Sequence, residues 1–280
     1  MENKSSRFSI AVFIKELILA FFTIAILSPI LYLVLGAFKK RSDIVKYPFA
    51  LTKEMFIFDN FPKAIINMNF WKALNNTVLI TVISLLIVIV VASLAGFAIA
   101  RAKGKLFSVF YGAAVSIMVI PFISCLIPCI TQATRLEIYN TLWGCIAYEA
   151  AWNTPMAIFL YTGFMRTLPS ELQDAAYIDG CSTMQIYSRV FLPLLVPVTA
   201  TTAIRCGVGM WNDYILARCM LNHVKLPTLM VSIYAFFGDR VNEYGLAFAG
   251  IILTSLPMIM IYVSLQKYFI KGIIAGAVKG

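Results

Sequence analysis

Three charged residues lie inside long apolar stretches of this sequence, namely Glu149, Arg205 and Asp213. A charge at the centre of a membrane-spanning helix costs about 2.5–3.5 kcal/mol on insertion scales, so these side chains are expected to face the interior of a helix bundle. Hydrogen-bond donors and acceptors beside aromatic rings suit the binding of a polar solute. The candidates for such a path through the membrane are Glu149, Trp152, Asn153, Trp211, Asn212 and Asp213.

Two other interpretations of these charges stay open. Arg205 and Asn212 are seven residues apart, which places them on one helix face, but the charges also fit an interhelical salt bridge or, for Asp213, a position at the outer interface. Glu149, Arg205 and Asp213 also fit a proton or ion relay in a secondary transporter or channel.

A second group of polar residues lies in Arg166–Pro193, the longest polar interruption between the later apolar stretches. Ser170 and Gln173 have capping-box spacing, and the first turn of the helix they predict carries Glu171 and Asp174, where the helix dipole favours acids. Gly180 is expected to end this helix.

A second short helix is expected to begin with the capping pair Ser182 and Gln185 and to break at Leu192–Pro193. On the first helix, a face of mostly small side chains bounded by acids suits insertion into a groove of another protein. That face consists of Leu172, Ala175, Ala176 and Ile178. The alternative is a helix that rests on the bilayer, although acids are poor partners for anionic lipid.

The composition indicates a membrane protein, because 61% of the 280 residues are hydrophobic and only 13% are charged. About 20 apolar residues span a bilayer as a helix, which predicts an all-α membrane protein with about six transmembrane helices. The runs are Leu17–Phe38, Trp71–Ala100, Leu106–Ile130, Thr141–Met165, Leu194–Ala217 and Leu246–Leu265. Pro121, Pro155 and Pro257 are expected to kink three of them.

The net charge of +10 does not indicate nucleic-acid binding, because the basic residues are scattered through loops. The turn Arg101–Lys105 holds three cations between two spans, which favours the cytoplasmic side for that turn and for both termini. With one histidine and six cysteines but no CxxC pair, neither a metal site, a disulfide nor another cofactor is expected.

Asp174-Ala175-Ala176, followed by Gly180 and then by Leu192-Pro193, resembles the EAA signature of ABC importer permeases. The surrounding string from Leu168 to Gly180 looks like the carbohydrate branch of that family, the maltose permease type. Asp174 departs from the glutamate that is usual there but keeps the charge. The resemblance implies a type I importer permease fold with a cytoplasmic coupling helix.

In the family this helix docks in the ATP-binding subunit. The resemblance assigns ATPase coupling to Glu171, Asp174, Ala175, Ala176, Gly180, Leu192 and Pro193. Gly180 is expected to adopt a positive φ, which a Cβ atom would penalise. The implied partners are a second homologous permease, two ATP-binding subunits, an extracytoplasmic solute-binding protein, membrane lipid and a carbohydrate, meaning a sugar, an oligosaccharide or a related polyol.

The chain has no GxxxxGK[ST] pattern, so ATP hydrolysis is expected on partner subunits and the chain itself is not expected to be an enzyme. An ion-coupled secondary transporter or channel is the alternative, although only six spans leave no visible inverted repeat. A membrane-bound enzyme would need a clustered polar site that the sequence does not show. The expected division is a cytoplasmic N-terminus (1–16), one permease domain (17–265) with the coupling region at 169–193, and a cytoplasmic tail (266–280).

Overall fold

The computed structural model describes residues 10–102, 104–237 and 243–277, and every regular element within these ranges is a helix. The all-α class is therefore confirmed. The described residues form two compact units. One comprises the residues up to Met68 together with Ile233–Leu253, and the other comprises Asn69–Ser232 and the residues from Thr254 onward.

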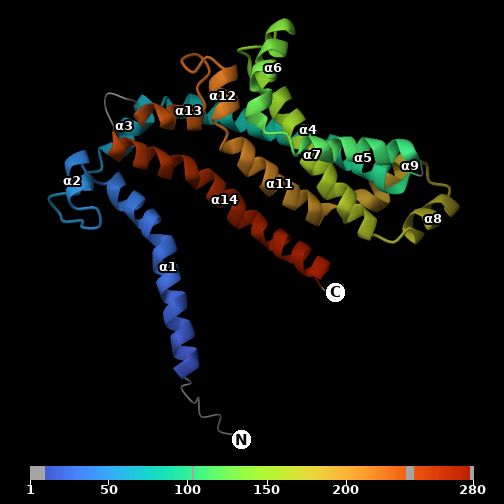
Figure 1. The fold of residues 1–280 in the computed structure, drawn as a ribbon, viewed down its shortest axis with the longest axis horizontal. Coiled ribbons are helices and arrows are strands. Elements are labelled where there is room, and N and C mark those ends of the chain that lie inside the picture. The colour runs from blue at the N-terminus through green and yellow to red at the C-terminus, as the bar shows by residue number, and fades with distance from the viewer. Residues whose placement is uncertain (1–9, 103, 238–242, 278–280) are drawn as a thin grey trace, which may run out of the picture. The chain divides into compact units, whose positions relative to one another are not determined.

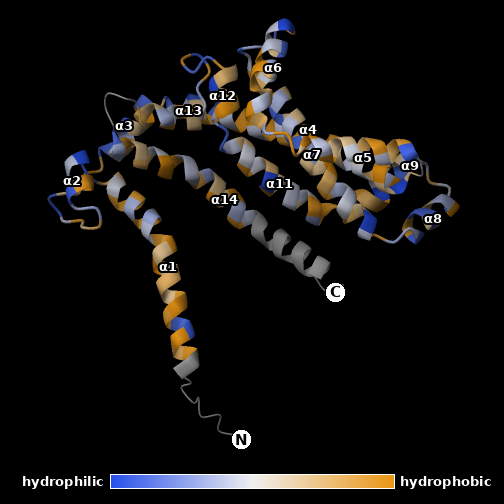
Figure 2. Ribbon diagram, viewed as in Figure 1, coloured by the Kyte–Doolittle hydropathy of each residue, from blue (hydrophilic) through white to orange (hydrophobic). Residues whose placement is uncertain are grey.

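The smaller unit contains the first apolar helix and short helices that follow it. Its elements are α1 (Ile10–Ala37), α2 (Arg41–Lys46), α3 (Asn60–Asn67), the 3₁₀ turn η2 (Ala235–Phe237) and the first part of α14 (Tyr244–Ala277). Helix α1 begins ahead of Leu17, the predicted start of the first span. Figure 2 shows that apolar residues dominate α1 along most of its length, as expected for a helix in lipid.

A buried lysine fixes the turn that leaves α1. The ammonium of Lys39 donates hydrogen bonds to the carbonyl oxygens of Tyr47 (2.8 Å) and Pro48 (3.0 Å). The amide of Asn60 donates to the carbonyl oxygens of Ala37 and Lys39, both at 2.9 Å. Burial lowers the pKa of Lys39 from its ordinary value, and the two carbonyl partners compensate part of the lost hydration.

The larger unit is built around one long helix pair, α4 and α7, which lie side by side in Figure 1. Its helices are α4 (Phe70–Arg101), α5 (Lys105–Ile117), α6 (Phe122–Arg135), α7 (Leu142–Thr167), α8 (Glu171–Ile178), α9 (Thr183–Gln185), the π-helical turn η1 (Ile186–Phe191), α10 (Leu192–Leu194), α11 (Val196–Trp211), α12 (Ile215–Met220) and most of α13 (Leu229–Tyr234). The later part of α14 completes it.

Small residues bring α4 and α7 into close contact. A Cβ atom added at Gly96 would lie 2.7 Å from the Cβ atom of Tyr161, and Ala157 of α7 is fully buried. The hydroxyl of Ser84 donates to the carbonyl oxygen of Ile146 at 3.1 Å. Small residues let helix backbones approach closely in a membrane, so the two helices form one rigid pair.

Three helices of the described chain are long and apolar enough to cross a membrane: Val12–Ala37, Phe70–Arg101 and Tyr244–Ser264. Two further candidates are broken spans. Lys105–Ile117 meets Phe122–Arg135 at a bend of 104°, and Thr183–Leu194 meets Val196–Trp211 at 73°. Up to five spans therefore follow from length and composition. Helix α7, with 26 residues, has the length of a span but is not among the helices that are apolar enough to be counted.

The predicted run Leu106–Ile130 is not one kinked helix. Pro121 is the N-cap residue of α6, and its extended ψ of 129° ends the helical path at that point. Helix α5 has already ended at Ile117, so the expected kink is a complete break between two helices. Pro155 and Pro257, in contrast, lie inside continuous helices.

The last helix extends beyond Leu265, the expected end of the sixth span. The backbone of α14 stays helical to Ala277, so most of the expected tail 266–280 continues the last helix. Residues 278–280, the N-terminal residues 1–9 and Lys103 of the basic turn lie outside the described residues.

Candidate functional site

The α8–α10 segment (residues 168–195) forms the two short helices that the sequence predicts. Helix α8 ends in a Schellman turn, in which Gly180 N–H donates to the carbonyl oxygen of Tyr177 and Cys181 N–H donates to that of Ala176, both at 3.0 Å. Gly180 has a φ of +76°, which confirms the expected positive value. Glycine is the residue that adopts this conformation without a Cβ penalty.

The start of α8 differs from the prediction. Ser170 has helical dihedral angles (φ −68°, ψ −28°), and its side chain makes no capping hydrogen bond. A capping side chain needs an extended backbone at its own position to reach the amide three residues on. The expected Ser170–Gln173 capping box is therefore wrong.

The capping box of the second helix is confirmed. The hydroxyl of Ser182 accepts from Gln185 N–H at 3.4 Å, and the side-chain oxygen of Gln185 accepts from Ser182 N–H at 2.8 Å. The helix then widens into the π-helical turn η1 and bends at Leu195, beyond the expected break at Leu192–Pro193. A π-helical turn shifts the hydrogen-bond pattern just before Pro193, which lacks an N–H group, so α10 continues for one short turn.

Helix α8 exposes one stripe of side chains and buries another. Glu171, Asp174, Ala175 and Ile178 follow the i, i+3, i+4, i+7 spacing of a single helix face, and all four are exposed. Ile178 is 86% exposed, whereas Ala176 is only 6% exposed and belongs to the core of the larger unit. The expectation that Ala176 shares an outward docking face is therefore wrong, because it lies on the opposite side of α8. Leu192 and Pro193 are exposed beyond the π-helical turn.

Four of the six candidates for the solute path, together with Arg205, line two adjoining cavities beside α7. A cavity of about 230 Å³ is lined by Phe122, Glu149, Trp152, Asn153, Arg205, Gly209, Asp213 and Leu216. A second, of about 200 Å³, is lined by Ile117, Met118, Trp152, Asn153, Pro155, Met156 and Arg205. Because Trp152, Asn153 and Arg205 line both cavities, we treat them as one feature, the polar cleft.

The polar cleft joins aromatic and polar groups in the way that the candidate residues suggest. The rings of Phe122 and Trp152 meet edge to face with centroids 4.9 Å apart. Asn153 donates to the side-chain Oε2 of Glu149 at 3.2 Å and to its carbonyl oxygen at 2.9 Å. The sequence did not predict Phe122 as a lining residue of the cleft. Its only local signal is its place directly after Pro121.

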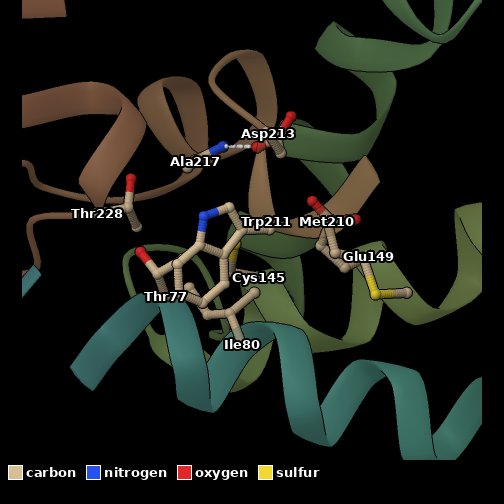
Figure 3. Close-up of a pocket in the computed structure, with 9 residues that line it drawn as sticks. All are labelled: Thr77, Ile80, Cys145, Glu149, Met210, Trp211, Asp213, Ala217 and Thr228. Carbon is tan, nitrogen blue, oxygen red and sulfur yellow. Dashed lines mark hydrogen bonds between the residues drawn. The ribbon is translucent and has the colours of Figure 1, made fainter. Parts of the chain in front are cut away.

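Trp211 and Asn212 do not line the polar cleft. Trp211 is buried beside Thr77 and Ile80 of α4, as Figure 3 shows. The cavity that these residues line has a volume of only about 10 Å³. Its indole N–H donates to the carbonyl oxygen of Thr254 at 3.2 Å. Asn212 is exposed, and its amide donates to the carbonyl oxygen of Val208 on its own helix.

The predicted span Leu194–Ala217 is wrong at its end, because α11 stops at Trp211. The carboxylate of Asp213 accepts from Ala217 N–H at 2.8 Å (Figure 3) and from Leu216 N–H at 3.3 Å, so it satisfies the free amides that begin α12. Asn212 N–H still donates to the carbonyl oxygen of Val208, and Arg205 and Asn212 are both exposed, so the helical face that they were expected to share is kept. Among the described residues, none of Glu149, Arg205 and Asp213 takes part in an ion pair, which does not support the salt-bridge interpretation.

The fold matches that of one chain of a solved ABC transporter. It is similar to a chain in the crystal structure of a bacterial ABC transporter involved in the import of the acidic polysaccharide alginate, with a TM-score of 0.75 and 20% sequence identity. The match covers 96% of this chain and 99% of that chain. At this identity the likeness establishes the fold alone.

Residues 89–275 match the family of binding-protein-dependent transport system inner membrane components, and the chain belongs to this family. It is 33% identical over 253 residues to the probable starch degradation products transport system permease protein AmyC of Thermoanaerobacterium thermosulfurigenes, covering 90% of this chain and 92% of AmyC. It is 38% identical over 224 residues to the melibiose/raffinose/stachyose import permease protein MelC of Bacillus subtilis, covering 80% of this chain and 81% of MelC. Such chains are permease components of importers rather than enzymes.

Proposed function

We propose that the chain is one of two membrane-spanning subunits of an ATP-driven carbohydrate importer, with α8 as the helix that docks in an ATP-binding subunit. The exposed stripe of α8 carries this proposal, because it offers two acids and a projecting isoleucine at the tip of a segment fixed by Gly180. Exposed apolar residues rimmed by charge are typical of protein interfaces. The proposal places this segment, the N-terminus and the C-terminal end of α14 on the cytoplasmic side.

Coupling then follows from the position of α8. ATP binding closes the two ATP-binding subunits against each other and draws the docked α8 helices together, which turns the polar cleft outward. Hydrolysis returns it inward. A second permease completes the path, and an extracytoplasmic solute-binding protein delivers the solute.

The polar cleft supports a carbohydrate as the solute. It offers the indole of Trp152, the amide of Asn153, the carboxyl group of Glu149 and the guanidinium of Arg205. Sugars bind through hydrogen bonds to such groups while their apolar faces lie against aromatic rings. The relatives named for melibiose, raffinose, stachyose and starch degradation products favour the same class of solute.

Purification of the tagged chain from its native membrane in mild detergent tests the proposal. Mass spectrometry is expected to find an ATP-binding subunit and a second multi-span permease in the same particle. Purified alone or as a homo-oligomer, in a preparation where known complexes survive, the chain would instead fit an ion-coupled transporter. Uptake that collapses on addition of an ionophore, and that persists without ATP, would support that second function.

Replacement of Trp152 by alanine tests the polar cleft. Loss of the aromatic face is expected to lower uptake about tenfold at limiting substrate, which corresponds to about 1.4 kcal/mol. The measurement is ATP-driven uptake by the reconstituted complex over a range of sugar concentrations. The yield of assembled complex is measured alongside, because Trp152 also packs on Phe122.

Asn212→Leu is the matched control for the Trp152 variant. Asn212 is a polar residue directly after α11, a helix that also contributes Arg205 to the polar cleft. Asn212 is exposed and lines none of the cavities described above. Its replacement is expected to leave uptake close to wild type. Equal uptake by the Trp152 variant and wild type would remove Trp152 from the solute path.

A further inference from the structure

The side chain of Arg101, the last residue of α4, holds both ends of the α8–α10 segment. Its Nη2 atom donates to the carbonyl oxygens of Met165 and Leu168, both at 2.8 Å, where the chain leaves α7. Its guanidinium carbon lies 4.7 Å from the centre of the Phe191 ring, where the chain leaves the π-helical turn. One side chain thus closes the base of the loop that carries α8.

The surrounding contacts add to this closure. The rings of Phe97 and Phe191 have centroids 5.4 Å apart, and those of Phe97 and Tyr187 lie 5.5 Å apart. The hydroxyls of Tyr187 and Ser93 are hydrogen-bonded at 2.7 Å. Residues from three successive turns of α4, namely Ser93, Phe97 and Arg101, therefore contact the π-helical turn.

The surroundings of the guanidinium stabilise its positive charge in this partly buried position. Carbonyl oxygens and an aromatic face stabilise a cation, and Arg101 has both. A neutral side chain of similar size would lose most of these interactions together.

Helix α4 connects these contacts to the part of the larger unit that contains Trp211 and the polar cleft. It runs without a break from Arg101 back to Ile80 and Thr77, which contact the region of Trp211 and Asp213. From Ile80 to Arg101 the helix spans about 30 Å at 1.5 Å per residue. Ser84, close to Ile80, is hydrogen-bonded to Ile146 of α7, which also supplies Glu149 and Trp152 to the polar cleft.

We infer that Arg101 is a positioning residue that makes α4 and the α8–α10 segment move as one body, so that displacement of α8 reaches the polar cleft through α4. This inference rests on the proposed function, because α8 must first be moved by a partner. Arg101 lies outside the exposed stripe of α8 and does not line the polar cleft. Its loss should separate ATP hydrolysis from transport without preventing assembly.

Arg101→Gln in the complete reconstituted complex tests the inference. The expected result is retention of the ATP-binding subunit together with a fall of about fivefold or more in the ratio of solute transported to ATP hydrolysed. Arg101→Lys keeps the charge but loses the planar fork, so its ratio is expected to lie between those of wild type and the glutamine variant. An unchanged ratio in Arg101→Gln would overturn the inference.

The matched control is Arg166→Gln. Arg166 lies in the last turn of α7, is exposed, and stacks on the ring of Tyr111 at 4.9 Å. It shares the charge and the ring contact of Arg101 but is not bonded to the α8–α10 segment, and its variant is expected to keep the wild-type ratio. An equal fall in both variants would show a general charge effect and would contradict a specific role for Arg101.

A second variant covers the case in which Arg101→Gln does not assemble. Phe191→Leu removes the ring under the guanidinium but leaves the carbonyl bonds, so a smaller fall in the same ratio is expected. A wild-type ratio in that variant would overturn the inference. If the wild-type complex contained no ATP-binding subunit, the proposed function itself would fail, which is a distinct outcome.

Discussion

Gly180→Pro is expected to abolish ATP-driven uptake. Proline fixes φ near −65° and has no N–H group, whereas Gly180 has a φ of +76° and donates to the carbonyl oxygen of Tyr177. A cost of about 3 kcal/mol or more would unfold the turn that ends α8, which corresponds to a fall in uptake of about a hundredfold. Uptake and ATP hydrolysis are measured together in proteoliposomes that contain the complete complex.

Gly180→Asn is the control for the proline variant. Asparagine adopts the left-handed region more readily than most residues, and no atom lies within 4 Å of a Cβ atom built at Gly180. The asparagine variant is expected to keep most of the uptake. Equal uptake in the proline variant and wild type would contradict the assignment of this turn to coupling.

Ile178→Asp is expected to release the ATP-binding subunit. Ile178 is 86% exposed on the outward stripe of α8, and a buried interface anchor of this kind contributes about 2 kcal/mol or more to binding. A third acid beside Glu171 and Asp174 would add repulsion within the stripe. The measurement is the amount of ATP-binding subunit that stays with the tagged permease after detergent washing.

Val224→Asp provides the comparison for the Ile178 variant. Val224 is 74% exposed in the link between α12 and α13, and its replacement introduces the same acid outside α8. It is expected to retain the ATP-binding subunit in full. Equal retention in the two variants would show that the stripe of α8 is not the docking surface.

Short-range features of the α8–α10 segment were the most predictable from the sequence. The Ser182–Gln185 box and the positive φ of Gly180 depend on neighbouring backbone atoms, and both are confirmed. The Ser170–Gln173 pair has the same spacing but does not form a box, because the backbone at Ser170 is already helical. The motif alone does not indicate which serine has the extended backbone that a cap requires.

Features that depend on distant contacts were not predictable in the same way. Polar residues within apolar runs identified Glu149, Trp152 and Asn153, which do line the polar cleft. The end of α11 at Trp211 depends on how Asp213 caps the next helix, and hydropathy contains no signal for that. Arg101 appeared in the sequence only as part of a basic turn, because its carbonyl partners lie more than sixty residues away.

The two faces of α8 differ in how much a substitution would cost the fold. Ala176 is held in the core of the permease, so a larger side chain there would cost folding energy whichever subunit is bound. Residues of the outward stripe contact no core, and exchanges at such surface positions usually change stability by less than about 0.5 kcal/mol. In the proposed importer, the outward stripe of α8 can therefore change together with its ATP-binding subunit at little cost to the stability of the membrane domain.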